Sequence, residues 1–202
     1  YDYIGARLAY RTNLFSQFRW LALQAIEKYL KALLLFNRIP ARKVGHDLAK
    51  ALPLPAKLPL ELQLSSKSLE FITYLNDSAR FRYLEGSYVV RGPKLIELDR
   101  TVWDLRRYCR PLNYEIPRSD GTLQNVLIME FAAIRAAESR PRHRFRIIAG
   151  QLEKILDKRT HPARPGLIWN NMFFGAATRH RVRMRITNFF ENAPLWLHPE
   201  IL

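Results

Sequence analysis

The sequence predicts a mainly α-helical protein: an antiparallel bundle of four or five helices, followed by a basic C-terminal region that is helical or contains short strands. Three observations support this fold class. Apolar residues recur at helical spacing in several long windows. Prolines and short polar segments separate these windows. With 48% hydrophobic and 12% aromatic residues, the 202-residue chain has enough apolar side chains for a folded core.

The first half of the chain is expected to form the bundle. Helical periodicity predicts helices over residues 2–10, 14–36, 47–52, 60–76 and 93–108. The long second helix should end before Pro40, because the residue that precedes a proline is disfavoured in helical geometry. In the last of these windows Leu95, Leu98 and Val102 mark one apolar face. Residues 79–90 fit neither helix nor strand clearly.

The second half is less regular. Residues 111–121 are expected to be a linker, because they hold two prolines and a Ser-Asp-Gly turn, and a helix is expected over 122–137. Arginines then alternate with other residues over 142–146 and over 181–185, which fits strands, although the second segment also fits a helix. We therefore predict a helical bundle over 1–113 and a basic C-terminal region of unknown type over 114–202.

The charge of the chain is strongly positive. It has 33 basic and 18 acidic residues, a formal net charge of +15, and both halves share the excess. Such a charge favours polyanionic partners with an affinity that falls with salt. Most of the basic residues are arginine, which binds phosphate and stacks on bases. RNA or a nucleotide is the expected partner, and the alternative is a solvated basic surface.

Composition also limits the classes of protein. Cys109 is the only cysteine, so an intrachain disulfide is ruled out and a reducing, cytoplasmic environment is expected. No apolar run reaches the roughly 18–20 residues that cross a bilayer, so no membrane partner is expected. Neither a zinc-spaced ligand pair nor a glycine-rich phosphate loop occurs, so we expect no metal and no cofactor. The chain begins at Tyr1 without a methionine, and we expect its true start to lie upstream.

Two motifs in the first half are the most specific. Residues 24–35 contain a Gln-Ala-x-Glu-Lys-x-x-Lys-Ala core, in which Glu27 stands four residues before Lys31 in the order that favours an ion pair. Residues 45–48 read Gly-His-Asp-Leu. A third, less specific element is residues 79–83, which read Ala-Arg-Phe-Arg-Tyr. In this order the three elements resemble the signature of HEPN domains, over about residues 1–113.

The resemblance implies a mainly antiparallel helical bundle, commonly dimeric, with a functional groove near the dimer seam. HEPN domains occur in prokaryotic toxins and phage-defence proteins and as partners of nucleotidyltransferases. Catalytic members carry an arginine, four to six residues and then a histidine, which together help cleave a phosphodiester. None of the five histidines here has an arginine at that spacing. The nuclease motif is therefore missing.

Several residues are candidates for function. His46 and Asp47 fit a general base with its orienting carboxylate, or a helix cap. Lys28 and Lys31 fit phosphate contacts or a solvated helix face. Trp169, Phe173 and Phe174 are most simply core residues. No catalytic residue is assigned beyond the candidate pair.

Two arginine-rich segments are the remaining candidates. Arg80, Arg82 and Tyr83 combine cations with a stacking ring, as single-stranded RNA binding favours, or they form a turn that closes the bundle. The arginine comb consists of Arg181, Arg183 and Arg185. On a strand these three would share one face at intervals of about 7 Å, whereas on a helix they would fan out.

Together these observations predict a non-catalytic RNA- or nucleotide-binding protein of the cytoplasm. The resemblance further implies a homodimer that works in a prokaryotic defence or toxin–antitoxin complex, with a nucleotidyltransferase or another component as partner. Two alternatives stay open. One is a metal-independent endoribonuclease with a divergent site at His46 or His143. The other is a structural module that dimerises and recruits a partner.

Overall fold

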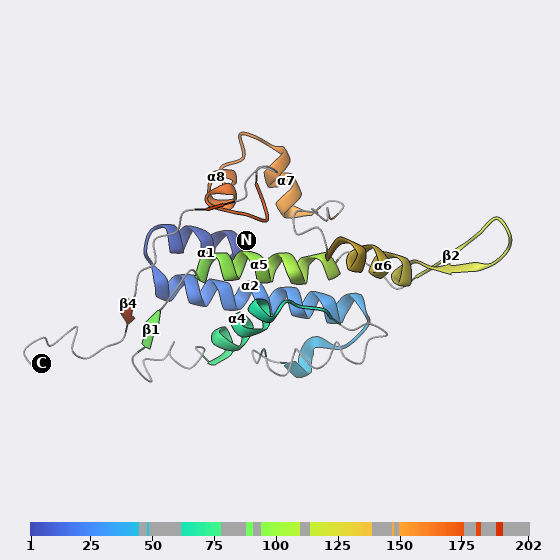
Figure 1. The fold of residues 1–202 in the computed structure, drawn as a ribbon, viewed down its shortest axis with the longest axis horizontal. Coiled ribbons are helices and arrows are strands. Elements are labelled where there is room, and N and C mark those ends of the chain that lie inside the picture. The colour runs from blue at the N-terminus through green and yellow to red at the C-terminus, as the bar shows by residue number, and fades with distance from the viewer. Residues whose placement is uncertain are drawn as a thin grey trace, which may run out of the picture.

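The fold is mainly helical, as predicted (Figure 1). The computed structural model describes residues 1–44, 48, 62–77, 88–90, 94–109, 114–138, 147, 150–175, 181–182 and 189–191. Its helices are α1 (Asp2–Arg11), α2 (Phe15–Phe36), the 3-10 turn η1 (Ala41–Val44), α4 (Ser66–Asp77), α5 (Lys94–Tyr108), α6 (Val126–Glu138), α7 (Gln151–Asp157) and α8 (Arg164–Ile168). Among the described residues, no helix is both long enough and apolar enough to cross a membrane.

Helix α2 is the long helix of the bundle, and its buried face follows the helical repeat. Phe18, Ala22, Ile26 and Leu30 are spaced four residues apart, and each is at most 1% exposed. This face packs against α1, α4 and α5. The predicted helices over 2–10, 14–36 and 93–108 are confirmed almost to the residue. The predicted helix over 47–52 lies outside the described residues apart from Leu48, which is buried.

Helix α4 starts later than predicted. The sequence pattern indicated a helix from residue 60, but residues 62–65 are not helical and the helix begins at Ser66. Ser65 is the reason, because its Oγ accepts a hydrogen bond from the Ser68 amide at 3.3 Å, as an N-cap residue does. The carboxylate of Asp104 on α5 also accepts a hydrogen bond from the Ser65 amide at 3.1 Å. A contact from another helix thus sets where α4 begins.

The predicted linker over 111–121 is wrong for its described part. Strands β2 (Glu115–Pro117) and β3 (Leu123–Asn125) pair antiparallel, so the helix expected from residue 122 begins only at Val126. Gly121 makes the turn with a φ of +82°, which glycine adopts without strain. The Asp120 carboxylate accepts a hydrogen bond from the Thr122 amide at 2.9 Å. The hairpin extends away from the bundle beyond α6 (Figure 1).

A second pair of strands joins distant parts of the chain. Strand β1 (Tyr88–Val90) pairs antiparallel with β4 (Phe189–Glu191), with Val89 opposite Phe190. Arg183 and Arg185 of the arginine comb, and the residues between them and β4, lie outside the described residues. Arg181 and Val182 are described, and they form neither helix nor strand.

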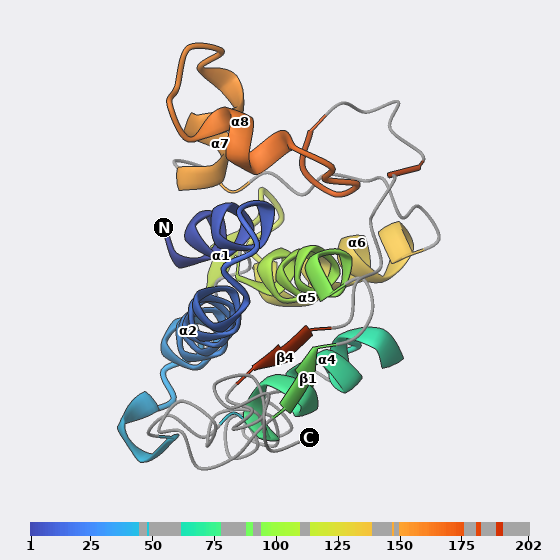
Figure 2. The ribbon, with the colours of Figure 1, turned by 90° about the vertical axis from the view of Figure 1, so that its left-hand side faces the viewer.

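Helices α7 and α8 lie on the opposite side of α1, α2 and α5 from α4 (Figures 1 and 2). Leu152, Ile155 and Leu167 from this segment are buried in the same core as the bundle. Gly166 allows the close approach of α8 to α1, because a Cβ atom there would lie 2.7 Å from Leu8 Cδ2. The segment 150–175 therefore packs directly on the bundle. The division of the chain at residue 113 stays a prediction.

Candidate functional site

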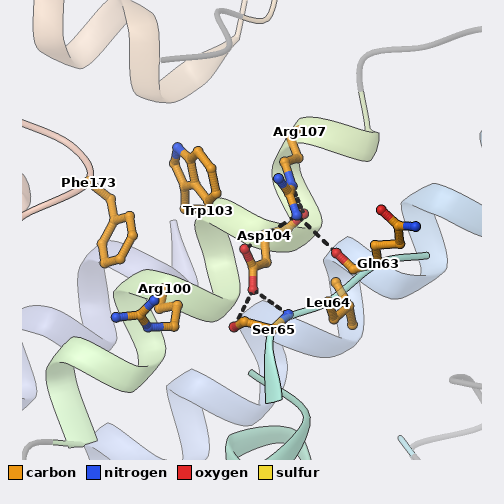
Figure 3. Close-up of a pocket in the computed structure, with 8 residues that line it drawn as sticks. All are labelled: Gln63, Leu64, Ser65, Arg100, Trp103, Asp104, Arg107 and Phe173. Atoms are coloured by element: carbon orange, nitrogen blue, oxygen red, sulfur yellow. Dashed lines mark hydrogen bonds and ion pairs between the residues drawn. The ribbon is translucent and has the colours of Figure 1, made fainter. Parts of the chain in front are cut away.

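A cavity of about 490 Å³ opens beside α5. Its lining comes from α5, from the segment that precedes α4, and from a bend near residue 173 (Figure 3). The lining residues, called the α5 pocket below, are Gln63, Leu64, Ser65, Arg100, Trp103, Asp104, Arg107 and Phe173.

Helical spacing explains the four residues that α5 contributes. Arg100, Trp103, Asp104 and Arg107 stand at positions i, i+3, i+4 and i+7, so they share one face of the helix. The apolar residues of α5, such as Leu98 and Val102, lie on its buried side. One helix thus serves both the core and the pocket.

Phe173 reaches the pocket through a hydrogen-bonded bend. The buried Asn171 accepts hydrogen bonds from the amides of Phe173 and Phe174 through Oδ1, at 2.9 and 2.8 Å. Its Nδ2 donates to the Tyr3 hydroxyl at 2.9 Å and to the Leu167 carbonyl at 3.0 Å. The bend is therefore tied to α1 and α8, which holds the aromatic ring in place.

The acidic side chain of the pocket is satisfied internally. Oδ2 of Asp104 accepts hydrogen bonds from the amide and the hydroxyl of Ser65 at 3.1 and 2.7 Å, and from the Ser68 hydroxyl at 2.6 Å. Its Oδ1 lies 3.6 Å from a terminal nitrogen of Arg107. These donors offset the negative charge, so Asp104 serves to order the pocket wall.

Arg107 is also part of the wall. It is 4% exposed, and it donates a hydrogen bond to the Gln63 carbonyl at 2.9 Å. Its guanidinium lies 4.8 Å from the centre of the Trp103 ring, within cation–π range. Figure 3 shows Arg107 pointing toward Gln63, away from Arg100 and Phe173. Asp104 and Arg107 together leave this side of the pocket close to neutral.

The opposite side combines a cation with two aromatic rings. The rings of Trp103 and Phe173 have centres 5.8 Å apart and are tilted by 39°. The Arg100 guanidinium lies 5.5 Å from the centre of the Phe173 ring, and both residues are half-buried. Among the described residues, no carboxylate lies within ion-pair distance of Arg100. This side can accept a flat ring that carries a negative group.

Comparison with models of known protein families identifies the family of this chain. A model of the HEPN domain matches residues 1–101, which is half of the chain. The protein belongs to the HEPN family. No curated protein and no solved structure matches the chain. HEPN membership suggests an RNA-related or nuclease-like function in general.

The matched region ends inside α5. Residues 1–101 include Arg100 and the segment before α4, whereas Trp103, Asp104, Arg107 and Phe173 lie beyond the match. The α5 pocket is therefore built partly by the HEPN bundle and partly by sequence that follows it.

The two lysines of the HEPN motif are both paired with acids. Lys31 forms the predicted ion pair with Glu27 on α2, at 2.6 Å. Lys28 is 65% exposed and pairs with Asp2 of α1. Neither lysine lines the α5 pocket. Their role as phosphate contacts stays a prediction. The Lys28–Asp2 pair lies at the surface and costs little to open, whereas Glu27 is only 4% exposed, so opening the Lys31–Glu27 pair would leave a buried carboxylate.

The other predicted site residues are mostly outside the described part of the chain. Arg181 is exposed. The remaining predicted residues, His46, Asp47, Arg80, Arg82, Tyr83, Arg183 and Arg185, lie outside the described residues. Their functional roles therefore stay predictions.

Two described residues, His161 and Cys109, belong to the types that often act in catalysis. Of the five histidines, His161 is the one within the described residues, and its Nδ1 accepts a hydrogen bond from the Ala163 amide at 3.1 Å. Burial raises the pKa of the Cys109 thiol to about 12, so this thiol is not a nucleophile. No group of three histidine, cysteine, aspartate or glutamate side chains with the geometry of a metal site occurs within the described ranges.

Sequence reasoning missed the α5 pocket, although part of its signal was present. The polar positions of α5 recur at helical spacing, which marks a second face of that helix. Phe173 was assigned to the core, yet it is half-buried and lines the pocket. The assignment of Phe174 to the core is confirmed, since it is 5% exposed, and Trp169 is half-buried.

Proposed function

We propose that the protein binds single-stranded RNA without cleaving it. Membership of the HEPN family supports a connection with RNA. No arginine precedes any histidine with four to six residues between the two, and this supports binding rather than cleavage, because an acid–base group and a phosphate-stabilising cation are then not paired in the usual way.

The observation that carries this proposal is how three of the four described buried arginines are paired. Arg7 pairs with Asp99, Arg106 with Glu153 and Arg107 with Asp104, and all six side chains are almost fully buried. Each pair is neutral. The net charge of +15 therefore belongs entirely to the rest of the chain, where basic residues outnumber acidic ones by an even higher ratio. Such an excess attracts a polyanion.

The binding test is fluorescence anisotropy with a labelled single-stranded RNA over a range of KCl concentrations. If about five phosphates are contacted, affinity should fall about 100-fold between 50 and 200 mM salt. No binding at the lowest salt concentration, or an affinity that does not change with salt concentration, would overturn the proposal. Incubation of the same RNA in EDTA tests cleavage. Products with 2′,3′-cyclic phosphate ends that disappear in His46→Ala or His143→Ala would favour the endoribonuclease alternative.

The arginine comb is the predicted phosphate contact that is easiest to test. Replacing Arg181, Arg183 and Arg185 together by glutamine should make the slope of log affinity against log salt concentration shallower by about two, because each of the three lost phosphate contacts contributes about 0.7 on a single strand. A matched control replaces Arg42, Arg118 and Arg135 by glutamine. These three arginines are exposed and lie in separate segments, so the control removes the same charge. If the two triple variants bind equally well, the comb is not a dedicated contact, although RNA binding itself would stand.

We further propose a homodimer that acts in the cytoplasm within a defence or toxin–antitoxin complex, with a nucleotidyltransferase as one potential partner. Light scattering coupled to size exclusion measures the dimer, and co-purification with the products of neighbouring genes identifies the partner. A structural recruiting module would be favoured instead if the protein binds no RNA, associates tightly with a partner, and keeps that association when the three comb arginines are replaced.

A further inference from the structure

The size of the α5 pocket suits one small molecule. Its volume of about 490 Å³ lies within the range of about 300–1,000 Å³ that is typical of ligand sites. A helix, a bend and the segment before α4 line it, and a cavity of this volume holds much less than a base-paired duplex. A single unpaired nucleotide is compact enough to fit.

The aromatic side of the pocket favours a flat ring. Trp103 is only 9% exposed and lies against Arg107, so it forms a rigid backing for the more accessible ring of Phe173. The two rings are too close and too tilted for a third ring to enter between them. A base would therefore lie against their open surface. Every nucleobase has such a π-face, so this contact tolerates any base.

The charge of the pocket favours an anionic group next to that ring. Asp104 and Arg107 offset each other, which leaves Arg100 to determine the sign of the cavity. Its guanidinium lies 5.5 Å from the centre of the Phe173 ring, close enough to bind the phosphate of a nucleotide whose base contacts that ring. At the other end, the exposed Gln63 has a side-chain amide that both donates and accepts hydrogen bonds, as any base edge requires.

We propose that the α5 pocket binds one unstacked nucleotide, with the base against Phe173 and the phosphate on Arg100. This inference rests on the proposed binding of single-stranded RNA, of which the pocket would hold one nucleotide. RNA-binding proteins commonly stack unpaired bases on aromatic rings in this way. The site would therefore add a stacking contact with one base, of any type, to an interaction otherwise driven by charge.

The test is isothermal titration of the full chain at low salt with AMP, UMP, adenosine and ribose 5-phosphate. AMP and UMP should bind with similar affinities, since the stacking contact tolerates any base. Ribose 5-phosphate has no base and should bind at least about fivefold more weakly, because stacking accounts for about 5- to 150-fold in affinity. Failure of AMP and UMP to saturate by about 10 mM would overturn the inference.

Two variants separate the base contact from the phosphate contact. Phe173→Leu keeps the site apolar and should weaken AMP about tenfold while leaving ribose 5-phosphate unchanged. Arg100→Gln should weaken AMP about tenfold and leave adenosine unchanged. The matched control is Arg135→Gln, which removes the same charge from the exposed face of α6. Circular dichroism confirms that each variant is folded. Equal AMP affinity in all three variants would contradict the assignment.

The RNA measurement distinguishes the two proposals. Salt-dependent RNA binding without AMP binding would overturn the pocket assignment and leave the proposed function in place. AMP binding with the expected variant effects, but no RNA binding at low salt, would support the pocket and overturn the single-stranded RNA function.

Discussion

Arg7 joins the first helix to α5 and to the segment that leads to Phe173, two of the three segments that position the pocket. Its side chain is fully buried and its Nε donates a hydrogen bond to the Gly166 carbonyl at 3.0 Å. Its two terminal nitrogens bind the Asp99 carboxylate on α5 and the Trp169 carbonyl. Asp99 is 1% exposed and accepts one more hydrogen bond, from the Tyr3 hydroxyl at 2.7 Å. We predict that Arg7→Met strongly destabilises the protein.

The structure sets the expected magnitude. Methionine keeps most of the apolar stem, so the main loss is the guanidinium. Without it, a buried carboxylate at Asp99 would retain only the Tyr3 hydroxyl, and Oδ2 of Asp99 already has no hydrogen-bond partner among the described residues. Removing one member of a buried ion pair costs about 3–5 kcal/mol. This cost is a large part of the free energy of unfolding of a typical protein, which is roughly 5–15 kcal/mol.

Urea unfolding followed by circular dichroism measures the change in the free energy of unfolding. The control is Arg135→Met on the exposed face of α6, which should stay within about 0.5 kcal/mol of the wild type. The double variant Arg7→Met with Asp99→Leu should recover about half of the loss or more, because it removes the unpaired buried charge. A cost below about 1 kcal/mol for Arg7→Met alone would refute the reasoning.

Two further predictions concern buried groups in contact with α5. Burial alone would raise the pKa of Glu153, but hydrogen bonds from Arg106 and the Ile147 amide lower it below its ordinary value of 4.5. The stability that this carboxylate contributes is present above that value and is lost as the pH falls through the lower folded pKa. The advantage of the wild type over Glu153→Gln in urea unfolding should therefore shrink in acid, and a constant difference would contradict it. Burial raises the pKa of Cys109 to about 12, so little thiolate is available in the folded protein. At about pH 8, iodoacetamide should therefore alkylate the native protein at least about tenfold more slowly than the urea-unfolded chain. Mass spectrometry measures both rates, and equal rates would contradict this prediction.

The elements that the sequence predicted well are those whose signal is local. Residues of α2 and α5 repeat their apolar face every three to four positions, so both helices were predicted almost to the residue. The ion pair between Glu27 and Lys31 also depends only on spacing within one helix, and it is present.

The elements that were predicted wrongly depend on partners distant in sequence or on weak patterns. The start of α4 at Ser66 follows from the contact of Ser65 with Asp104, which lies 39 residues further along the chain. The β2–β3 hairpin consists of two three-residue strands, and such short strands have too little alternation to be recognised. Only its Asp120-Gly121 turn was visible in advance.

By itself, the sequence determined the mainly helical fold, the membership of the HEPN family and the strong positive charge, because local periodicity, motif order and composition require no knowledge of packing. Only the tertiary structure decided which arginines are neutralised inside and which remain available. Arg7 and Arg107 meet buried carboxylates, whereas Arg100 meets the ring of Phe173, more than 70 residues away. Burial and pairing are properties of segments brought together by folding, and the α5 pocket exists only where those segments meet.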